Sequence, residues 1–399
     1  MINIINKTDC CGCSVCMQIC PKQCISMKED EEGFLYPIIN SEDCINCHKC
    51  EYVCPLKKNN DSSIPLEVVA ANNKNENERI NSSSGGVFIL LAKYVLMNNG
   101  IVFGAVYDNL WEVHHGCATD LGGVQKMIGS KYMQSRIEET FKSAELYLKE
   151  GREVLFTGTP CQILGLHSYL RKNYDNLLTV DICCHGVPSP GVWRRYLSDI
   201  IQKVCVSRGK KDECKKINDD IEITNINFRD KRNTGWKKYS LALNLKRNKK
   251  TFFYSKTNRE DLYMQGFLKN IYLRPSCYNC KCKNGCSQSD ITIGDFWGIN
   301  KIMPDIDDDN GLSLVLINSE KGRKIFYKLN VETWPFSFSI AKQTNRGLSN
   351  HIDIPPQRDK FFKLFNQNEI CTLSLIKRFT RVSKIRRLYY LVKSIIRHI

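Results

Sequence analysis

One stretch decides the fold of this chain. It reads LFTGTPCQILGL at residues 155–166 and, a short interval later, LLTVDICCHGVPSP at residues 177–190. Residues 154–156 and 177–182 are apolar runs bounded by turn residues, which is typical of short buried strands, and residues 163–170 fit a helix between them. The sequence therefore predicts a strand–turn–helix–strand unit of an α/β sheet.

Two cysteines follow the strands of this unit. The turn Gly158-Thr159-Pro160 brings Cys161 to the start of the helix, and Cys184 follows the second strand. Because open α/β sheets bind ligands at the carboxyl ends of their strands, we expect both thiols to line one crevice. His185 is the best candidate for a proton donor there, since imidazole titrates near neutral pH, and a structural hydrogen bond is its alternative role.

The chain has 399 residues and 21 cysteines. So many thiols indicate either disulfides in an oxidising compartment or cluster and metal ligation in a reducing one. The N-terminus, MINIINKTDCCGC, lacks the basic and apolar regions of a secretory signal, which favours the cytoplasm. The longest apolar segment, residues 86–97, is interrupted by Lys93 and is too short to span a bilayer.

Two cysteine runs near the N-terminus have the spacing C-x2-C-x2-C-x3-C-P. This pattern is typical of bacterial two-cluster ferredoxins, in which the fourth cysteine of each run binds the other cluster. We therefore expect one [4Fe-4S] cluster on Cys10, Cys13, Cys16 and Cys54, and a second on Cys44, Cys47, Cys50 and Cys20. Zinc, the alternative, uses pairs of CxxC instead. Cys11 and Cys24 lie outside the spacing and are expected to be unligated.

Two turns precede probable helices. Residues 81–86 read NSSSGG before an apolar helix at 87–97, and residues 128–135 read IGSKYMQS before a helix at 137–149. Small polar residues at a helix start either cap the helix or bind phosphate. The antiparallel strands predicted in residues 221–256 contain a basic turn with the cations Arg229, Lys231 and Arg232. These cations either neutralise an anionic ligand or face solvent.

A second cysteine cluster follows at Cys277-x2-Cys280, with Cys282 and Cys286 nearby. Either these four thiols form a local site, for which zinc competes, or distant thiols complete a site with Cys277 and Cys280.

The formal net charge is +16, and residues 356–399 hold 11 Lys and Arg against two Asp and Glu. Basic patches can indicate nucleic acid or membrane surfaces. Here the excess is spread over a tail and several loops, so we expect no nucleic-acid partner. Residues 373–399 have the pattern of a basic amphipathic helix, which either lies on an anionic membrane as a peripheral contact or packs on protein.

Six motifs in this order resemble the coenzyme F420 hydrogenase/dehydrogenase beta-subunit family over about residues 3–340: SKYMQS, GTPCQ, CHGVPSP, FRDK, LRPSCYNC and DFWG. The resemblance implies a flavin-binding α/β domain with its own [4Fe-4S] cluster. It also implies electron transfer between iron–sulfur relays and a hydride carrier or reducible substrate. Relatives include sulfite reductases, chlorophyll-cycle enzymes and bacterial proteins of polysaccharide biosynthesis, so the resemblance leaves the substrate open.

Carried over by motif, the resemblance implies that a third [4Fe-4S] cluster is bound by Cys161, Cys184, Cys277 and Cys280. It implies FAD contacts from Ser83, Ser84, Gly85, Gly86, Ser130, Lys131, Gln134, Thr157, Gly158, Thr159 and Gln162. The additional Cys282 and Cys286 depart from the simplest pattern.

The predicted fold is α/β with α+β character. We expect a ferredoxin module at 1–60, a linker at 61–78, a flavin-binding α/β domain at 79–205, a part with an antiparallel subdomain at 206–345, and a helical tail at 346–399. The predicted function is an oxidoreductase that passes electrons between a donor, the clusters and FAD, with hydride exchange to a small molecule. A non-enzymatic subunit that hands electrons to a redox partner protein is the alternative.

Overall fold

The computed structural model describes residues 1–58, 61–205, 221–248, 250–348 and 352–381. Within them, the largest sheet has eight strands in the order β13-β3-β12-β11-β7-β6-β4-β5. Strands β11, β7, β6 and β4 run parallel, and the other neighbours are antiparallel. The strands span Glu67–Asn73 (β3), Ile101–Tyr107 (β4), Val113–Ala118 (β5), Val154–Gly158 (β6), Leu177–Ile182 (β7), Ile291–Asp295 (β11), Ser313–Ile317 (β12) and Val331–Pro335 (β13). The predicted mixed α/β fold is confirmed.

The strand–turn–helix–strand unit forms as predicted. Strands β6 and β7 pair in parallel, with Val154 opposite Leu177, and α7 between them spans Pro160–Leu170. The helix starts earlier than the apolar pattern indicated, because Thr159 caps it in a capping box with Gln162 and proline occupies its first position. Cys161 therefore lies in the first helical turn.

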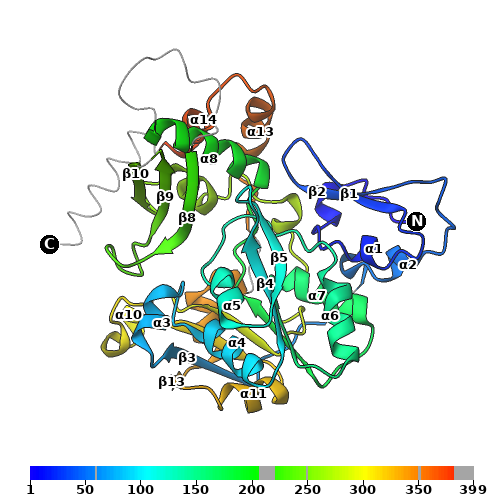
Figure 1. Ribbon diagram of the computed structural model, residues 1–399, viewed down its shortest axis with the longest axis horizontal. Coiled ribbons are helices and arrows are strands. Elements are labelled where there is room, and N and C mark those ends of the chain that lie inside the picture. The colour runs from blue at the N-terminus through cyan, green and yellow to red at the C-terminus, as the bar shows by residue number, and fades with distance from the viewer. Residues whose placement is uncertain (59–60, 206–220, 249, 349–351, 382–399) are drawn as a thin grey trace.

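Helices cover both faces of the large sheet (Figure 1). One face packs against α4 (Val87–Met97), α5 (Leu121–Met127) and α11 (Glu320–Phe326). The opposite face packs against α6 (Thr140–Lys149) and α7, and farther along the sheet against α10 (Ile299–Ile302) and α12 (Phe338–Thr344). Strand β3 shows the alternation expected of a buried strand, since Val69 and Ala71 face the first layer while Val68 and Ala70 face the second.

The structure differs from the predicted linker at 61–78, because residues 67–73 form strand β3. This strand pairs with β12 and β13 inside the sheet, and α3 (Glu76–Asn81) follows it. The polar surroundings of the short apolar run VVAA obscured a strand that is buried on both faces. The predicted boundary at residue 205 also does not divide the sheet, since β11, β12 and β13 come from the later part of the chain.

The N-terminal module lies beside α6 and α7 (Figure 1). It consists of a hairpin and short helical segments: η1 (Lys7–Asp9), α1 (Val15–Gln18), β1 (Ile25–Glu29), β2 (Leu35–Ile39), α2 (Lys49–Tyr52) and η2 (Pro55–Lys57). The amide oxygen of Gln18 accepts from the backbone N–H of Phe141, at the start of α6. The module therefore packs directly on the sheet domain.

The tip of this hairpin is anchored at a second place. The Glu32 carboxylate accepts two hydrogen bonds from Arg358, at 2.9 and 2.5 Å, and the Ser189 hydroxyl donates to the Glu32 carbonyl oxygen. Gly33 is so close to Gly191 that an added Cβ would lie 2.4 Å from the Gly191 nitrogen. This docking is buried, because Glu32 and Arg358 are 9% and 6% exposed.

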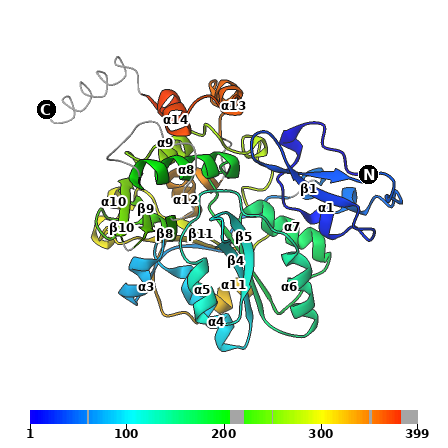
Figure 2. The same cartoon turned by 45° about the horizontal axis from the view of Figure 1, so that its top comes forward.

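The predicted antiparallel subdomain is a three-stranded sheet of β8 (Ile221–Asp230), β9 (Ser240–Arg247) and β10 (Lys250–Thr257). It shares one apolar core with α8 (Pro190–Cys205), α9 (Leu262–Leu268), α13 (Arg358–Asn366) and α14 (Thr372–Thr380) (Figure 2).

The described part of the predicted tail helix is α14, which buries Leu375 and Ile376 in this core. Residues 382–399 of that prediction lie outside the described residues, as do residues 207–220, whose charged sequence predicts a loop. Across the described ranges, no helix combines the length and apolar character needed to cross a bilayer.

Candidate cofactor sites

The two cysteine runs fold into loops of the same backbone shape. Gly12 and Asn46 occupy equivalent positions with φ of +71° and +50°, and Ser14 and His48 follow with φ of +59° and +58°. Left-handed residues at this spacing turn successive backbone N–H groups toward one centre, a concavity that binds anions and iron–sulfur clusters. Both loops therefore have the backbone of a cluster site.

The structure brings the fourth cysteine of each run to the other loop. Cys54 lies beside the first loop. The pKa of Cys16 in this loop is raised to about 12, mainly by burial and then by the neighbouring thiols of Cys10 and Cys54. Cys20 lines a pocket with the thiols of the second loop, Cys44, Cys47 and Cys50. Cys24 lines the same pocket, with its sulfur 3.5 Å from that of Cys20. This arrangement is what the predicted crossover of ligands requires.

Replacing Cys54 with serine is expected to damage the cluster built on Cys10, Cys13 and Cys16, because Cys54 lies with those thiols. The Cys44-based cluster should persist. Electron paramagnetic resonance of the reduced protein, with iron quantification, measures both. Cys24→Ser is the matched control and should keep both clusters. Loss confined to the Cys44-based cluster would refute the crossover.

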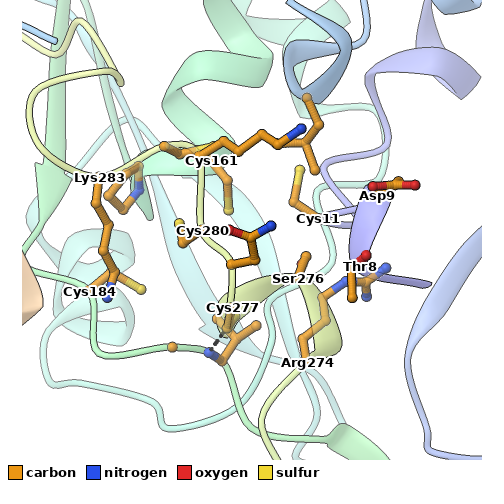
Figure 3. A pocket seen from close by; sticks show the side chains of 17 residues that line it. Thr8, Asp9, Cys11, Cys161, Cys184, Arg274, Ser276, Cys277, Cys280 and Lys283 are labelled. Carbon is orange, nitrogen blue, oxygen red and sulfur yellow. Dashed lines mark hydrogen bonds between the residues drawn. The ribbon is translucent and has the colours of Figure 1, made fainter. Parts of the chain in front are cut away.

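A second thiol-lined cavity lies between the N-terminal module and the sheet domain (Figure 3). Cys161 enters it from the first turn of α7, Cys184 from the loop after β7, and Cys277 and Cys280 from η3 (Pro275–Cys277) and the turn that follows. Burial raises the pKa of Cys277 to about 12, while the Val187 N–H lies 3.4 Å from its sulfur. The structure thus brings together four thiols from three separate segments.

Two further thiols share this cavity: Cys11, which was expected to be unligated, and Cys282, which belongs to the alternative local set. The neighbouring Cys11 thiol is the largest cause that raises the pKa of Cys161, and the Cys282 thiol is the largest cause that lowers the pKa of Cys280. Cys286 is not among the residues that line the cavity. Nowhere in the described part of the chain do three Cys, His, Asp or Glu side chains group closely enough to hold a single metal ion.

The turn at 83–86 meets the loop at 128–135. The Ser83 hydroxyl accepts from the Ser130 backbone N–H at 2.7 Å, and Gly86 begins α4 with a φ of +82°. From the subdomain, Arg229 donates to the Ser83 carbonyl at 3.0 Å and Lys231 to the Ser84 carbonyl at 2.9 Å. The turn predicted to contact a flavin is therefore enclosed by cations.

Two lysines of these segments form no ion pair among the described residues. Lys131 donates to three backbone carbonyls, of residues 127, 128 and 129, and Lys231 donates to the carbonyls of Ser84 and Asn310. Among the described residues, no carboxylate lies within ion-pair distance of either ammonium group. Burial lowers the pKa of each lysine to about 7. Lys231, which donates to the turn just before α4, is a cation that would favour an anion there, whereas the Lys131 ammonium lies against its own loop.

Of the three cations in the basic turn, Arg232 faces solvent. Its side chain is half-exposed and pairs with Asp230 at 2.7 Å. Arg229 and Lys231 instead are 3% and 4% exposed. The sequence contained all three cations but no signal that separates the inward pair from the outward one.

Several predicted flavin contacts are engaged within the protein. The Gln162 amide accepts from the Thr159 N–H at 2.9 Å and donates to the Ser135 carbonyl at 3.1 Å. The Thr157 hydroxyl donates to the Phe103 carbonyl at 2.9 Å. Their polar groups fix the end of β6, where Gly158 lies.

Gln134 is also engaged. Its amide donates to the Cys11 carbonyl at 2.9 Å and accepts from Arg274 at 2.8 Å. Gln134 therefore faces the N-terminal module, whereas Ser130 of the same loop faces the 83–86 turn.

Two histidines lie near the predicted sites. His185 makes a 2.6 Å hydrogen bond with Asn270, as in the structural role given as its alternative, and burial lowers its pKa. His115, which sequence reasoning missed, bonds the Ser135 hydroxyl at 2.7 Å and the Thr157 carbonyl at 2.9 Å. Burial lowers the pKa of His115 to about 4.

Comparisons with known proteins concern two parts of the chain. Residues 9–58 match the model of the 4Fe-4S dicluster domain, which supports iron–sulfur clusters in the N-terminal module. Residues 151–333 match the model of the C terminus of the coenzyme F420 hydrogenase/dehydrogenase beta subunit, and the resemblance of the motifs to this oxidoreductase family is confirmed.

No curated protein matches the chain. Among solved structures, a chain of the F420-reducing [NiFe] hydrogenase complex from Methanosarcina barkeri is similar at 16% identity. The match covers 80% of this chain and 92% of that chain, with a TM-score of 0.43.

Proposed function

We propose that this chain is a flavin-dependent iron–sulfur oxidoreductase with a third [4Fe-4S] cluster on Cys161, Cys184, Cys277 and Cys280. The observation that carries the proposal is the meeting of these four thiols in one cavity beside the dicluster domain. Ligands so far apart in sequence are joined only by folding, so a bound cluster would stabilise the fold. Cys286 does not line the cavity, which disfavours the purely local set of four thiols.

FAD is the second cofactor of the proposal, with its pyrophosphate at the 83–86 turn. Support comes from Lys231, whose buried ammonium group donates to the Ser84 carbonyl of this turn and forms no ion pair among the described residues. The loop at 128–135 reaches from this turn to the Cys11 carbonyl, and so connects the anion site with the thiol cavity. When bound, a flavin supplies the exchange between one-electron and two-electron chemistry.

The external reactants follow from this scheme. A redox partner protein or reduced carrier would deliver electrons to the clusters, and a small molecule would exchange a hydride, such as a deazaflavin-type coenzyme or a polysaccharide-biosynthesis substrate. The reducing cytoplasm is the compartment in which so many thiols remain available for clusters.

Anaerobic purification with quantification of iron, sulfide, zinc and flavin tests the proposal. Three clusters predict about 12 irons and 12 sulfides per chain, with one flavin. About eight irons without flavin would contradict it and support the electron-transfer subunit instead. Reoxidation of the reduced flavin by candidate substrates then separates an enzyme from a carrier, since a carrier requires its partner.

Lys231→Met is expected to weaken flavin binding about tenfold to a hundredfold, because hydrogen bonds to charged groups contribute about 1.5–3 kcal/mol. Flavin retained after gel filtration, and the Kd from fluorescence titration, measure the loss. Arg232→Gln removes a cation from the same turn that faces outward, and should bind flavin normally. Equal flavin affinity in both variants would place the pyrophosphate elsewhere.

The flavin-free protein is expected to gain stability as pH rises from about 7 toward 10. Burial lowers the pKa of Lys231 to about 7 in the folded protein, whereas the ordinary value is 10.5. Between these values the unfolded chain binds more protons, so the free energy of unfolding rises with pH. Urea unfolding at pH 7 and 9 should show a smaller rise in Lys231→Met. An identical rise in both proteins would contradict this assignment.

A further inference from the structure

Arg274 is a fully buried arginine between the N-terminal module and the thiol cavity, with 0% exposure. Its guanidinium donates to the Cys10 carbonyl at 2.8 Å and the Leu35 carbonyl at 2.9 Å, and it lies 4.3 Å from the Tyr36 ring centroid. It also donates to the sulfur of Cys10 at 3.5 Å. One cation thus contacts both the backbone and the thiol of a predicted cluster ligand.

No carboxylate forms an ion pair with Arg274 in the described ranges. Its oxygen partners are two carbonyls and the Gln134 amide, all of them neutral. A buried charge is costly unless an opposite charge accompanies it. Burial by itself lowers the pKa of Arg274, and the largest opposing contributions, which raise it, come from the Cys10 thiol, the Tyr36 phenol and the thiols of Cys11 and Cys277.

Other buried arginines of the protein are accompanied by carboxylates. Arg358 pairs with Glu32 where the same hairpin docks, and Arg229 pairs with Asp295 at 2.8 Å. The described residues offer Arg274 no carboxylate. Its counter-charge must therefore come from thiolate sulfur and from the cluster that the thiolates bind.

The backbone around Gly12 leaves room for the Arg274 and Gln134 side chains to come close to the first cluster loop. A Cβ at Gly12 would lie 2.7 Å from the Gln134 amide nitrogen and 2.8 Å from an Arg274 nitrogen. Glycine at this position lets both side chains reach the Cys10–Cys11 backbone.

We propose that Arg274 is the counter-ion of the cluster on Cys10, Cys13, Cys16 and Cys54, and that it raises the reduction potential of this cluster above that of its twin. Reduction adds a negative charge, so a cation and N–H donor at a ligand sulfur stabilise the reduced form more than the oxidised form. Arg274 is a positioning residue, since it acts through Cys10.

The two cluster loops have the same backbone shape. Lys22 and Lys49 line the pocket of the second loop, but among the described contacts only the first loop has a cationic side chain that donates to a ligand sulfur. The equivalent thiol of the second loop, Cys44, lies 3.9 Å from the Asn46 amide oxygen instead. The Cys277 N–H donates to the Arg274 carbonyl at 2.9 Å, so the same turn carries a thiol of the cavity. Arg274 therefore gives the two clusters different electrostatic surroundings. It does so on the side where electrons would pass to the sheet domain.

Redox titration of the full-length holoprotein, followed by electron paramagnetic resonance, tests this role. Arg274→Gln should lower the midpoint potential of the Cys10-based cluster by at least the ~59 mV that corresponds to a tenfold change in a one-electron equilibrium. The Cys44-based cluster is the internal reference and should not move. Arg274→Lys should shift the potential less, because it keeps the charge. The Cys54→Ser variant assigns the two signals.

A matched control perturbs the same docking interface away from sulfur. The double variant Glu32→Gln with Arg358→Gln removes a buried ion pair at the hairpin tip, and both midpoint potentials should stay unchanged. If they shift as in Arg274→Gln, loosened docking rather than charge explains the effect and the proposal fails.

A second variant covers the case in which Arg274→Gln does not assemble its cluster. Gln134→Glu places a carboxylate on an Arg274 partner 2.8 Å away and should lower the same potential. Unchanged potentials in an assembled Arg274→Gln or Gln134→Glu protein would overturn the proposal. The readout comes only from the two clusters of the dicluster domain, so a missing third cluster or flavin would refute the proposed function without affecting this result.

Discussion

Replacing Cys161 with serine is expected to remove about a third of the bound iron, since one cluster of three would be lost. The thiol of Cys161 enters the cavity from the first turn of α7, and serine offers a harder oxygen ligand that suits cluster iron poorly. The two N-terminal clusters should keep their resonance signals, because their ligands come from other loops. Iron quantification and electron paramagnetic resonance measure both outcomes.

Cys286→Ser is the matched control for this prediction. Cys286 belongs to the same cysteine-rich turn as Cys280 but does not line the cavity, so this variant should keep its full iron content. A folded Cys161→Ser protein with full iron, together with loss in Cys286→Ser, would favour the local set of thiols and overturn the long-range one.

Replacing Gly85 with alanine is expected to destabilise the protein by about 3 kcal/mol, the upper end of the range for overpacked sites. A Cβ there would lie 2.3 Å from the Ala71 carbonyl oxygen of β3 and 2.7 Å from the Ser313 nitrogen of β12. Both are backbone atoms of paired strands, which cannot retreat as a flexible side chain can. The same shift would displace the 83–86 turn, so flavin content should fall as well.

Gly122→Ala is the control for added volume. Gly122 is exposed near the start of α5, and its nearest neighbour would be a side-chain oxygen of Asp120 at 3.3 Å. Alanine inside a helix is favoured over glycine by about 0.5–1 kcal/mol, so this variant should be at least as stable as the parent. Urea unfolding of both variants gives the free energies. Equal stability of Gly85→Ala and the parent would contradict the predicted clash.

The parts of the fold that the sequence predicted are those encoded by local pattern. The β6–α7–β7 unit follows from apolar runs and a turn between them, and the cluster loops follow from a repeated cysteine spacing. In both cases neighbours in sequence determine the structure. The apolar run of strand β3 indicates a possible strand but falls inside the predicted linker, because the run is short and its burial depends on β12 and β13, far along the chain.

The residues of the site that were missed depend on contacts between distant segments. Arg274 and Cys11 meet only because the N-terminal module docks on the sheet domain. Lys231 and Arg232 are neighbours in sequence, and their opposite environments arise from the packing of β8 against the 83–86 turn. His115 has no motif around it and is recognised only by its two hydrogen bonds.

The docking of the hairpin tip would allow the dicluster domain and the rest of the protein to exist as two separate chains. Contacts of Glu32, Gly33 and Cys10 with the sheet domain are made through buried side chains and backbone, not through the peptide connection between the two parts. A chain interrupted after the dicluster domain would keep all of these contacts available. Two separately translated polypeptides should therefore recognise each other and assemble into one relay.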